Sequence, residues 1–348
     1  MIIGACFESM RYLDAFPEYD RGMVNQLLLT ATETPSIAGV HFHPGVYRQL
    51  YDLEPRGNVH LRGVAGQTVF EPVYGRGRVV KSNLEITPRL AISGITFRNG
   101  FDWSEWSLSQ RWQNSPIQLA GCTDLHVYDC AFEGWLATCI SVASANLTKR
   151  VTVERCQFGG GDVVTANGIA VKGIDGLRVR DCEFNDIARG VTTENDQGRH
   201  CYNIHVTGNT FRRTRVSTIT ETNTGVAVHI QPEDAHTRYL IITDNVFLAT
   251  DGGVDIGFLC SAWEGREPMD AVVERNVISG RVARQSYDTA IAVTRCGGIV
   301  IANNVIGTNP ESMPHWAIRL RETADFTETV IGENVMDGSF HDPPISIT

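Results

Sequence analysis

Long apolar runs are missing from this 348-residue sequence. None approaches the roughly 18 consecutive apolar residues of a membrane-spanning helix. The first residues also lack the charged segment and the long apolar segment of a secretory signal peptide. We therefore expect no membrane association, and a protein that is cytoplasmic or released without a recognisable signal peptide.

Cysteine motifs and an excess of basic residues are missing as well. The nine cysteines are an odd number and include no Cys-x-x-Cys, which argues against a disulfide framework and against structural zinc. The 30 Lys and Arg face 40 Asp and Glu, so the net charge is −10. Because nucleic acids bind basic surfaces, we expect no nucleic-acid partner. The 42% of hydrophobic residues excludes a disordered chain.

A short motif repeats from about residue 90 onward. Each copy contains alternating apolar residues, a turn, a Cys or Asn, one further residue and a Phe or similar apolar residue. One aligned column contains Ile92, Val127, Val153, Val179, Val206, Ile242, Val273, Ile301 and Ile331. Another contains Phe97, Phe132, Phe158, Phe184, Phe211, Phe247, Ile278, Ile306 and Met336. Nine copies, 26 to 36 residues apart, indicate a solenoid.

The period of two within each copy predicts strands, and no copy contains a convincing amphipathic helix. Two residues before the Phe column stand Cys130, Cys156 and Cys182, followed by Asn209, Asn245, Asn276, Asn304 and Asn334. Stacked Asn amides satisfy buried backbone groups from coil to coil, whereas stacked cysteines fill apolar space. We therefore predict an all-β protein, a right-handed parallel β-helix of about nine to eleven coils.

This pattern resembles the pectate-lyase-like β-helix superfamily, without identifying one of its families. The segment 21–30 after Asp20 predicts a short helix that caps the solenoid, and VHFHPGVYR at 40–48 is similar to the entry into such folds. We expect one domain over residues 1–348, with the cap and first coils in 1–90 and regular coils in 91–348. The resemblance implies carbohydrate chemistry by lyases, hydrolases, epimerases, fructan transferases or tailspike-like proteins.

A second strand in each copy predicts the working face. Its apolar pairs, such as Ile169 and Val171, are expected to point inward, so the residues between and after them point outward. This alignment places Lys172, Glu194 and His229 on three successive coils, with Asp255 diagonal to His229. We predict these four residues as the catalytic group.

Loops that leave the same strands supply further candidates, because insertions on one edge of a repeat often form the binding face. The predicted substrate-binding residues are Arg199, His200, Asp234, His236, Trp263, Arg319 and Arg321. Oxygen ligands for an optional calcium ion are available at Glu194, Asp196, Glu233 and Asp234, although no cofactor is required. The histidines at His41, His43, His60 and His126 are interpreted as structural.

The preferred hypothesis is a lyase that acts by β-elimination on an acidic poly- or oligosaccharide. Lys172 or His229 would be the base, Glu194 would orient it or bind metal, and Asp255 would be a second carboxylate. One alternative is glycoside hydrolysis or intramolecular glycosyl transfer by Glu194 and Asp255. Others are a biosynthetic lyase, cyclase or isomerase for a small metabolite, and a non-catalytic tailspike-like glycan-binding protein. A homo-oligomer is possible, since similar proteins include trimers.

Overall fold

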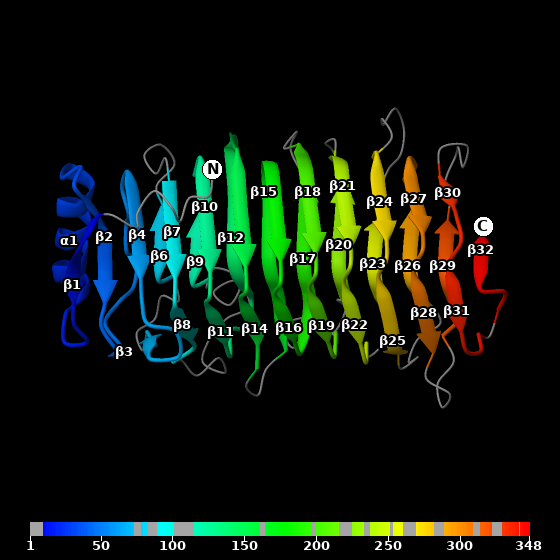
Figure 1. Ribbon diagram of the computed structural model, residues 1–348, viewed down its shortest axis with the longest axis horizontal. Coiled ribbons are helices and arrows are strands. Elements are labelled where there is room, and N and C mark those ends of the chain that lie inside the picture. The colour runs from blue at the N-terminus through cyan, green and yellow to red at the C-terminus, as the bar shows by residue number, and fades with distance from the viewer. Residues whose placement is uncertain are drawn as a thin grey trace.

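The computed structural model describes residues 10–72, 78–82, 89–100, 115–120, 122–160, 164–195, 200–215, 225–232, 237–250, 253–259, 269–281, 289–308, 314–321, 329–340 and 342–348. Of these, residues 144–148, 194, 195, 232 and 281 are described by their backbone alone. The described chain winds into coils that stack along one long axis (Figure 1). Every strand pairs in parallel with the equivalent strand of the next coil, which confirms the predicted β-helix.

Three faces make up each regular coil. The first face contains β1 (Arg11–Ala15), β2 (Ile37–Phe42), β4 (Asn58–Arg62), β7 (Arg89–Ser93), β10 (Asp124–Tyr128), β13 (Arg150–Glu154), the second half of β15 (Thr165–Arg180), β18 (Cys201–Thr207), β21 (Thr237–Thr243), β24 (Ala271–Glu274), β27 (Ile299–Ala302) and β30 (Val330–Ile331). The second face contains β3 (Gly45–Tyr47), β5 (Thr68–Phe70), β8 (Ile95–Arg98), β11 (Ala131–Glu133), β14 (Gln157–Gly159), β16 (Glu183–Asn185), β19 (Thr210–Arg212), β22 (Val246–Leu248), β25 (Val277–Arg281), β28 (Val305–Thr308) and β31 (Val335–Asp337). The third face contains β6 (Val80–Ser82), β9 (Ile117–Leu119), β12 (Thr138–Thr148), the first half of β15, β17 (Ile187–Asn195), β20 (Val226–Pro232), β23 (Val254–Leu259), β26 (Thr289–Thr294), β29 (Trp316–Arg321) and β32 (Ile345–Ile347).

Both predicted apolar columns form as aligned. Strand pairing joins all nine residues of the Val/Ile column on the first face and all nine of the Phe column on the second. From Phe97 to Phe247 the rings stack inside the coil, with centroids 4.7–5.1 Å apart. Since one ring repeats at nearly the strand spacing, each Phe buries the faces of its neighbours.

The predicted asparagine ladder also forms. The Asn245 side-chain oxygen accepts from the backbone N–H and the amide of Asn209, both at 3.0 Å, and its own amide donates to the Val206 carbonyl at 2.8 Å. Asn276 and Asn304 repeat this pattern one and two coils further on. The described cysteines are free and buried, as expected of apolar fillers.

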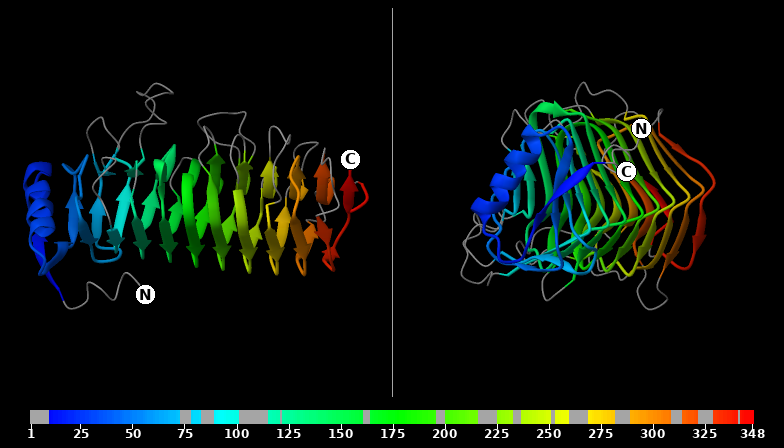
Figure 2. Two further views of the ribbon diagram at one scale, coloured as in Figure 1. Left: turned by 90° about the horizontal axis from the view of Figure 1, so that it is seen from above. Right: turned by 60° about the vertical axis from the view of Figure 1, so that its left-hand side comes forward.

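Helix α1 (Arg21–Glu33) covers the N-terminal end of the stack, as Figure 2 shows. It buries Val24, Leu28 and Ala31 against the core. The predicted cap is confirmed, because the Asp20 carboxylate accepts from the Met23 backbone N–H at 2.8 Å. Among the described residues, no helical segment combines the length and apolar character that a membrane crossing requires.

Replacing the capping residue should loosen this end of the molecule. We expect Asp20→Ala to lower the free energy of unfolding by about 1 kcal/mol, because the Met23 N–H loses its acceptor. Asp20→Asn keeps an acceptor oxygen and should retain most of the stability. Urea titration followed by circular dichroism measures both, and equal losses in the two variants would contradict a capping role.

Candidate functional site

The outer side of the third face forms the candidate site. Ile169, Val191, Val228 and Ile256 are fully buried in the core, so the residues that follow them in each strand face outward. The column they form runs through Gln118, Ser141, Ala170, Thr192, His229, Gly257, Ala292 and Arg319. A parallel column two residues further along contains Ala143, Lys172, Glu194, Gln231, Leu259, Thr294 and Arg321, of which Glu194 is described by its backbone alone.

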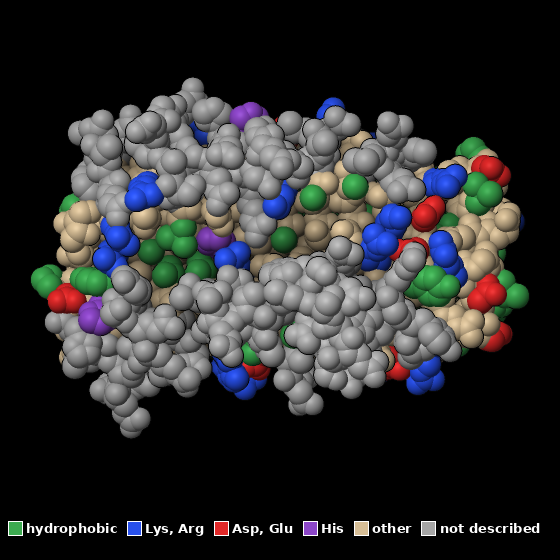
Figure 3. Space-filling model, turned by 180° about the vertical axis from the view of Figure 1, so that it is seen from behind, with side chains coloured by type: hydrophobic (Ala, Val, Ile, Leu, Met, Phe, Trp, Pro, Cys, Tyr) green, Lys and Arg blue, Asp and Glu red, His purple; other side chains and the backbone are tan. Residues whose placement is uncertain are grey.

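A third outward column precedes these two, across a bend in the coil. It contains Thr138, Asn167, Arg189, Val226, Val254, Thr289 and Trp316. Val226 and Val254 form an apolar cluster with Ala292 and Leu259 that is separate from the main core. We call the three columns between β9 and β29 the trough floor. Figure 3 shows hydrophobic, histidine and basic side chains along the long axis of one face, with acidic side chains beside the basic ones toward its right-hand end.

His229 lies near the middle of the trough floor and is only 3% exposed. Its Nδ1 lies 3.1 Å from the Thr192 hydroxyl on the preceding coil. Burial, reinforced by the positive charge of Arg189, lowers the pKa of His229 to about 3. The imidazole is therefore neutral at physiological pH.

The alignment around His229 differs from the predicted one by two residues. The sequence alignment paired Glu194 with His229, whereas the structure pairs Thr192 with His229 and Glu194 with Gln231. A shift of two residues keeps every side chain on its own side of the sheet, so the apolar alternation cannot detect it. Lys172 lies two coils and two residues from His229, roughly 12 Å at ordinary strand spacing.

Asp255 was predicted to face outward, and this placement is wrong. Its side chain is fully buried, and it accepts a hydrogen bond from the Thr250 hydroxyl. The neighbouring residues on adjacent coils, Ala227 and Ala290, are also buried in the main core. The coil bends here, so that two successive residues turn inward and the period of two is interrupted. Asp255 therefore cannot share the outer surface with Lys172.

Of the other predicted residues, Lys172 is half-buried on the trough floor, and Arg319 and Arg321 lie at its C-terminal end. His200 precedes β18 and stacks with Tyr202, with ring centroids 5.9 Å apart, so it lies outside the three columns. The remaining predictions, namely Asp196, Arg199, Glu233, Asp234, His236 and Trp263, together with the Glu194 side chain, lie outside the described residues. The optional calcium site is among them.

Three residues of the trough floor were not singled out from the sequence. Asn167 is 4% exposed and donates to the Thr138 hydroxyl at 3.1 Å. Arg189 places its charge beside His229. The third residue is Trp316, whose ring centroid lies 4.2 Å from the guanidinium carbon of Arg319. Arg189 stands two residues before the inward Val191, so strict alternation predicts it on the inward side, and only the bend in the coil places it outward.

Basic residues are frequent among the described side chains of the trough floor. Its described side chains include Lys172, Arg189, Arg319 and Arg321, while Glu194, which is described by its backbone alone, also stands in the second column. The chain as a whole carries a net charge of −10. A basic strip on an acidic protein favours an anionic ligand.

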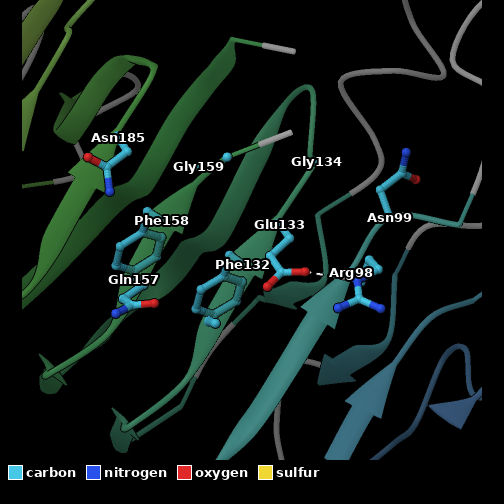
Figure 4. Close-up of a pocket in the computed structure, with 11 residues that line it drawn as sticks. Arg98, Asn99, Phe132, Glu133, Gly134, Gln157, Phe158, Gly159 and Asn185 are labelled. Atoms are coloured by element: carbon cyan, nitrogen blue, oxygen red, sulfur yellow. Dashed lines mark hydrogen bonds and ion pairs between the residues drawn. The ribbon is translucent and has the colours of Figure 1, made fainter. Parts of the chain in front are cut away.

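A separate depression of about 440 Å³ lies on the second face and is shown in Figure 4. Arg98 and Glu133 line it and pair with each other at 2.8 Å, while each side chain stays more than 40% exposed. Gly134, Gly159 and Gly160 line it as well. Arg98 and Glu133 already pair with each other and are open to water, so we expect this depression to bind a charged ligand more weakly than the trough floor does.

The comparisons with known proteins agree with this architecture. A family model described as "Right handed beta helix region" matches residues 89–261. The chain is a right-handed parallel β-helix. This agrees with the predicted fold, and no individual family is identified. No curated protein sequence matches it.

Several solved structures resemble this β-helix. A surface adhesin of Streptococcus pneumoniae matches with a TM-score of 0.60 and 12% identity, over 98% of this chain and 92% of the adhesin. An exopolygalacturonase of Thermotoga maritima matches with a TM-score of 0.41 and 10% identity, over 97% and 96% of the two chains. The A-module of a mannuronan C-5 epimerase of Azotobacter vinelandii gives 0.37 and 12%, over 99% and 97%. At such identities the adhesin match shows a shared fold, and function has to be argued from the site.

Proposed function

We propose that this chain binds an acidic polysaccharide or oligosaccharide along the trough floor and cleaves it by β-elimination. The observation that carries the proposal is the set of four basic side chains along the described floor of a protein whose net charge is −10, namely Lys172, Arg189, Arg319 and Arg321. Arginine binds carboxylates through paired N–H groups, which suits uronate sugars.

The length and apolar parts of the floor favour a sugar chain. Eight strands from β9 to β29 span about 34 Å at ordinary strand spacing, more than a single small metabolite needs. The cluster of Val226, Val254 and Leu259 and the ring of Trp316 offer apolar surface beside the charges. Sugar rings present an apolar CH face and a polar rim, so such a mixed surface fits them.

In the proposed reaction, Arg189 neutralises the uronate carboxylate and His229 accepts the proton from the adjacent carbon. The electron pair of that C–H bond forms a carbon–carbon double bond, the bond to the leaving sugar oxygen breaks, and that oxygen takes a proton from solvent. Lys172, roughly 12 Å away, binds the carboxylate of another sugar. Hydrolysis by Glu194 and Asp255 is disfavoured, because Asp255 faces the core.

Binding tests the charge argument. We expect Arg189→Ala and Arg319→Ala each to weaken binding of a polyuronate about tenfold, which corresponds to about 1.4 kcal/mol. Arg212→Ala is the matched control, because Arg212 is an exposed arginine of the second face, paired with Glu183 at 3.2 Å. Affinity electrophoresis in polyuronate gels and in neutral glucan gels measures the effect. Equal retardation in both gels, or unchanged binding of the two trough variants, would argue against the proposal.

Turnover separates the lyase from a second candidate, a glycan-binding protein without catalysis. The second candidate is favoured by the low pKa of His229, about 3, which makes its imidazole a weak base. A lyase generates an unsaturated product that absorbs in the ultraviolet, and His229→Gln should abolish this product while binding persists. If the wild-type chain retains polyuronate binding and yields no unsaturated product, the second candidate is correct.

A further inference from the structure

We propose that Asp14, His41 and His43 form a binding site for zinc or a chemically similar divalent transition metal. The site lies on the first face beside the N-terminal cap, away from the trough floor. It is independent of the proposed glycan chemistry.

Strand pairing brings the three side chains together. His41 and His43 flank Phe42, which is fully buried, so both imidazoles emerge on the outer side. Asp14 of β1 pairs directly with His41 of β2. The three candidate ligand atoms all lie within 4.8 Å of one another.

The distances suit a shared ion. His43 Nε2 lies 3.0 Å and His41 Nδ1 lies 3.7 Å from the same Asp14 oxygen. Ligand atoms around one tetrahedral zinc ion are roughly 3–3.5 Å apart, so small side-chain rotations suffice. Two imidazole nitrogens and one carboxylate oxygen favour zinc and its neighbours over calcium or magnesium.

The surroundings hold part of the site in place. The ring of Phe16 stacks on His43 at 4.6 Å with the planes 5° apart, which restricts the imidazole. The backbone N–H of His43 donates to the Ala15 carbonyl at 3.0 Å, so the ladder between β1 and β2 continues to this residue. All three side chains are between 30% and 57% exposed, which leaves an entry path and room for a water ligand.

Arg62 opposes cation binding. It lies on β4 directly beside His41, and its charge contributes to the lowered pKa of that imidazole, behind burial and the neighbouring His43. Its guanidinium lies over the ring of Tyr12, 5.6 Å from the centroid. This arrangement makes a specific prediction, since removal of Arg62 should strengthen metal binding.

Titration of the full chain with Zn²⁺ and Co²⁺ tests the site. We expect saturable binding of one ion, cobalt absorption bands typical of nitrogen and oxygen ligands, and a rise in thermal midpoint that a chelator reverses. Asp14→Asn, His41→Gln and His43→Gln should each weaken binding at least tenfold, whereas Arg62→Ala should tighten it several-fold. His205→Gln, which removes another first-face histidine, is the matched control.

Two results would overturn the proposed metal site. Unchanged affinity in all three ligand variants overturns the proposal, as does a thiolate-to-cobalt charge-transfer band, which would assign the ion to a cysteine. Circular dichroism confirms that each variant is folded. Because Arg62→Ala leaves the three ligands intact, its gain in affinity supports the site even if one ligand variant folds poorly.

Discussion

Asn276→Ala should lower the free energy of unfolding by about 3 kcal/mol. Asn276 is fully buried, and its side-chain oxygen accepts from the backbone N–H of Asn245 at 3.1 Å and from the Asn245 amide at 3.0 Å. Its own amide donates to the Ile242 carbonyl at 2.9 Å. The variant leaves the buried N–H of Asn245 without its acceptor and opens a small cavity, and each effect costs about 1–3 kcal/mol.

The end of the ladder supplies the control. Asn334 makes the same contacts to Asn304 but is half-buried at the C-terminal end, so water can replace its side chain. We expect Asn334→Ala to cost about 1 kcal/mol or less. Urea titration at constant m-value measures both variants. Equal losses would show that burial of the ladder does not determine its contribution to stability.

Acidification from pH 7 to pH 5 should destabilise the protein by about 4 kcal/mol through two buried histidines. Burial lowers the pKa of both His60 and His229 from 6.5 to about 3, with help from Arg62 and His126 for the former and Arg189 for the latter. In this range the unfolded chain binds protons that the folded chain does not, so stability falls as pH falls below about 6.5. Each group contributes about 2 kcal/mol over this interval.

Three other histidines also lower the stability between pH 7 and pH 5, whereas Glu154 affects the stability only at lower pH. The pKa values of His41, His126 and His205 are also lowered, chiefly by burial, which steepens the loss. For Glu154, burial raises the pKa, but Arg180 and His126 outweigh it and the net pKa is lowered. The stability that this carboxylate supplies is present above its ordinary value of 4.5 and is lost only at more acidic pH.

The free energy of unfolding, measured at several pH values between 7 and 5, tests this expectation. Its slope against pH gives the number of protons that the unfolded chain binds in excess of the folded chain. His229→Gln should remove about half of the contribution of the two histidines, whatever its effect at pH 7. The half-buried His200 lies outside both sites, and His200→Gln is the matched control. A slope that is unchanged in His229→Gln would show that His229 does not remain neutral in the folded state.

The apolar columns and the ladder could be predicted because they repeat. A parallel stack places equivalent residues above one another, so each coil must supply a side chain of similar size and chemistry at the same position. Phe184 and Asn245, for example, each contact the same type of residue on the coil before and the coil after. This repetition makes the register of the first and second faces visible in the sequence.

The candidate site does not repeat, so its sequence signal was weaker. His229, Thr192 and Arg189 are different residues on adjacent coils, and only the pairing of β17 with β20 places them together. The alternation of Val226, Val228 and Ile230 is compatible with two registers that differ by two residues. His41 and His43 were interpreted as structural, because nothing in the sequence places Asp14 beside them.

The sequence by itself determined the coil, the composition of its core and the capping helix, because these follow from local alternation and from chemical repetition. The tertiary structure decided which outward residues meet, that Asp255 faces the core and that Asp14 reaches two histidines. The physical reason is that contacts between coils depend on register and on bends in the backbone. Both shift the outer surface without changing the apolar pattern that buries the core.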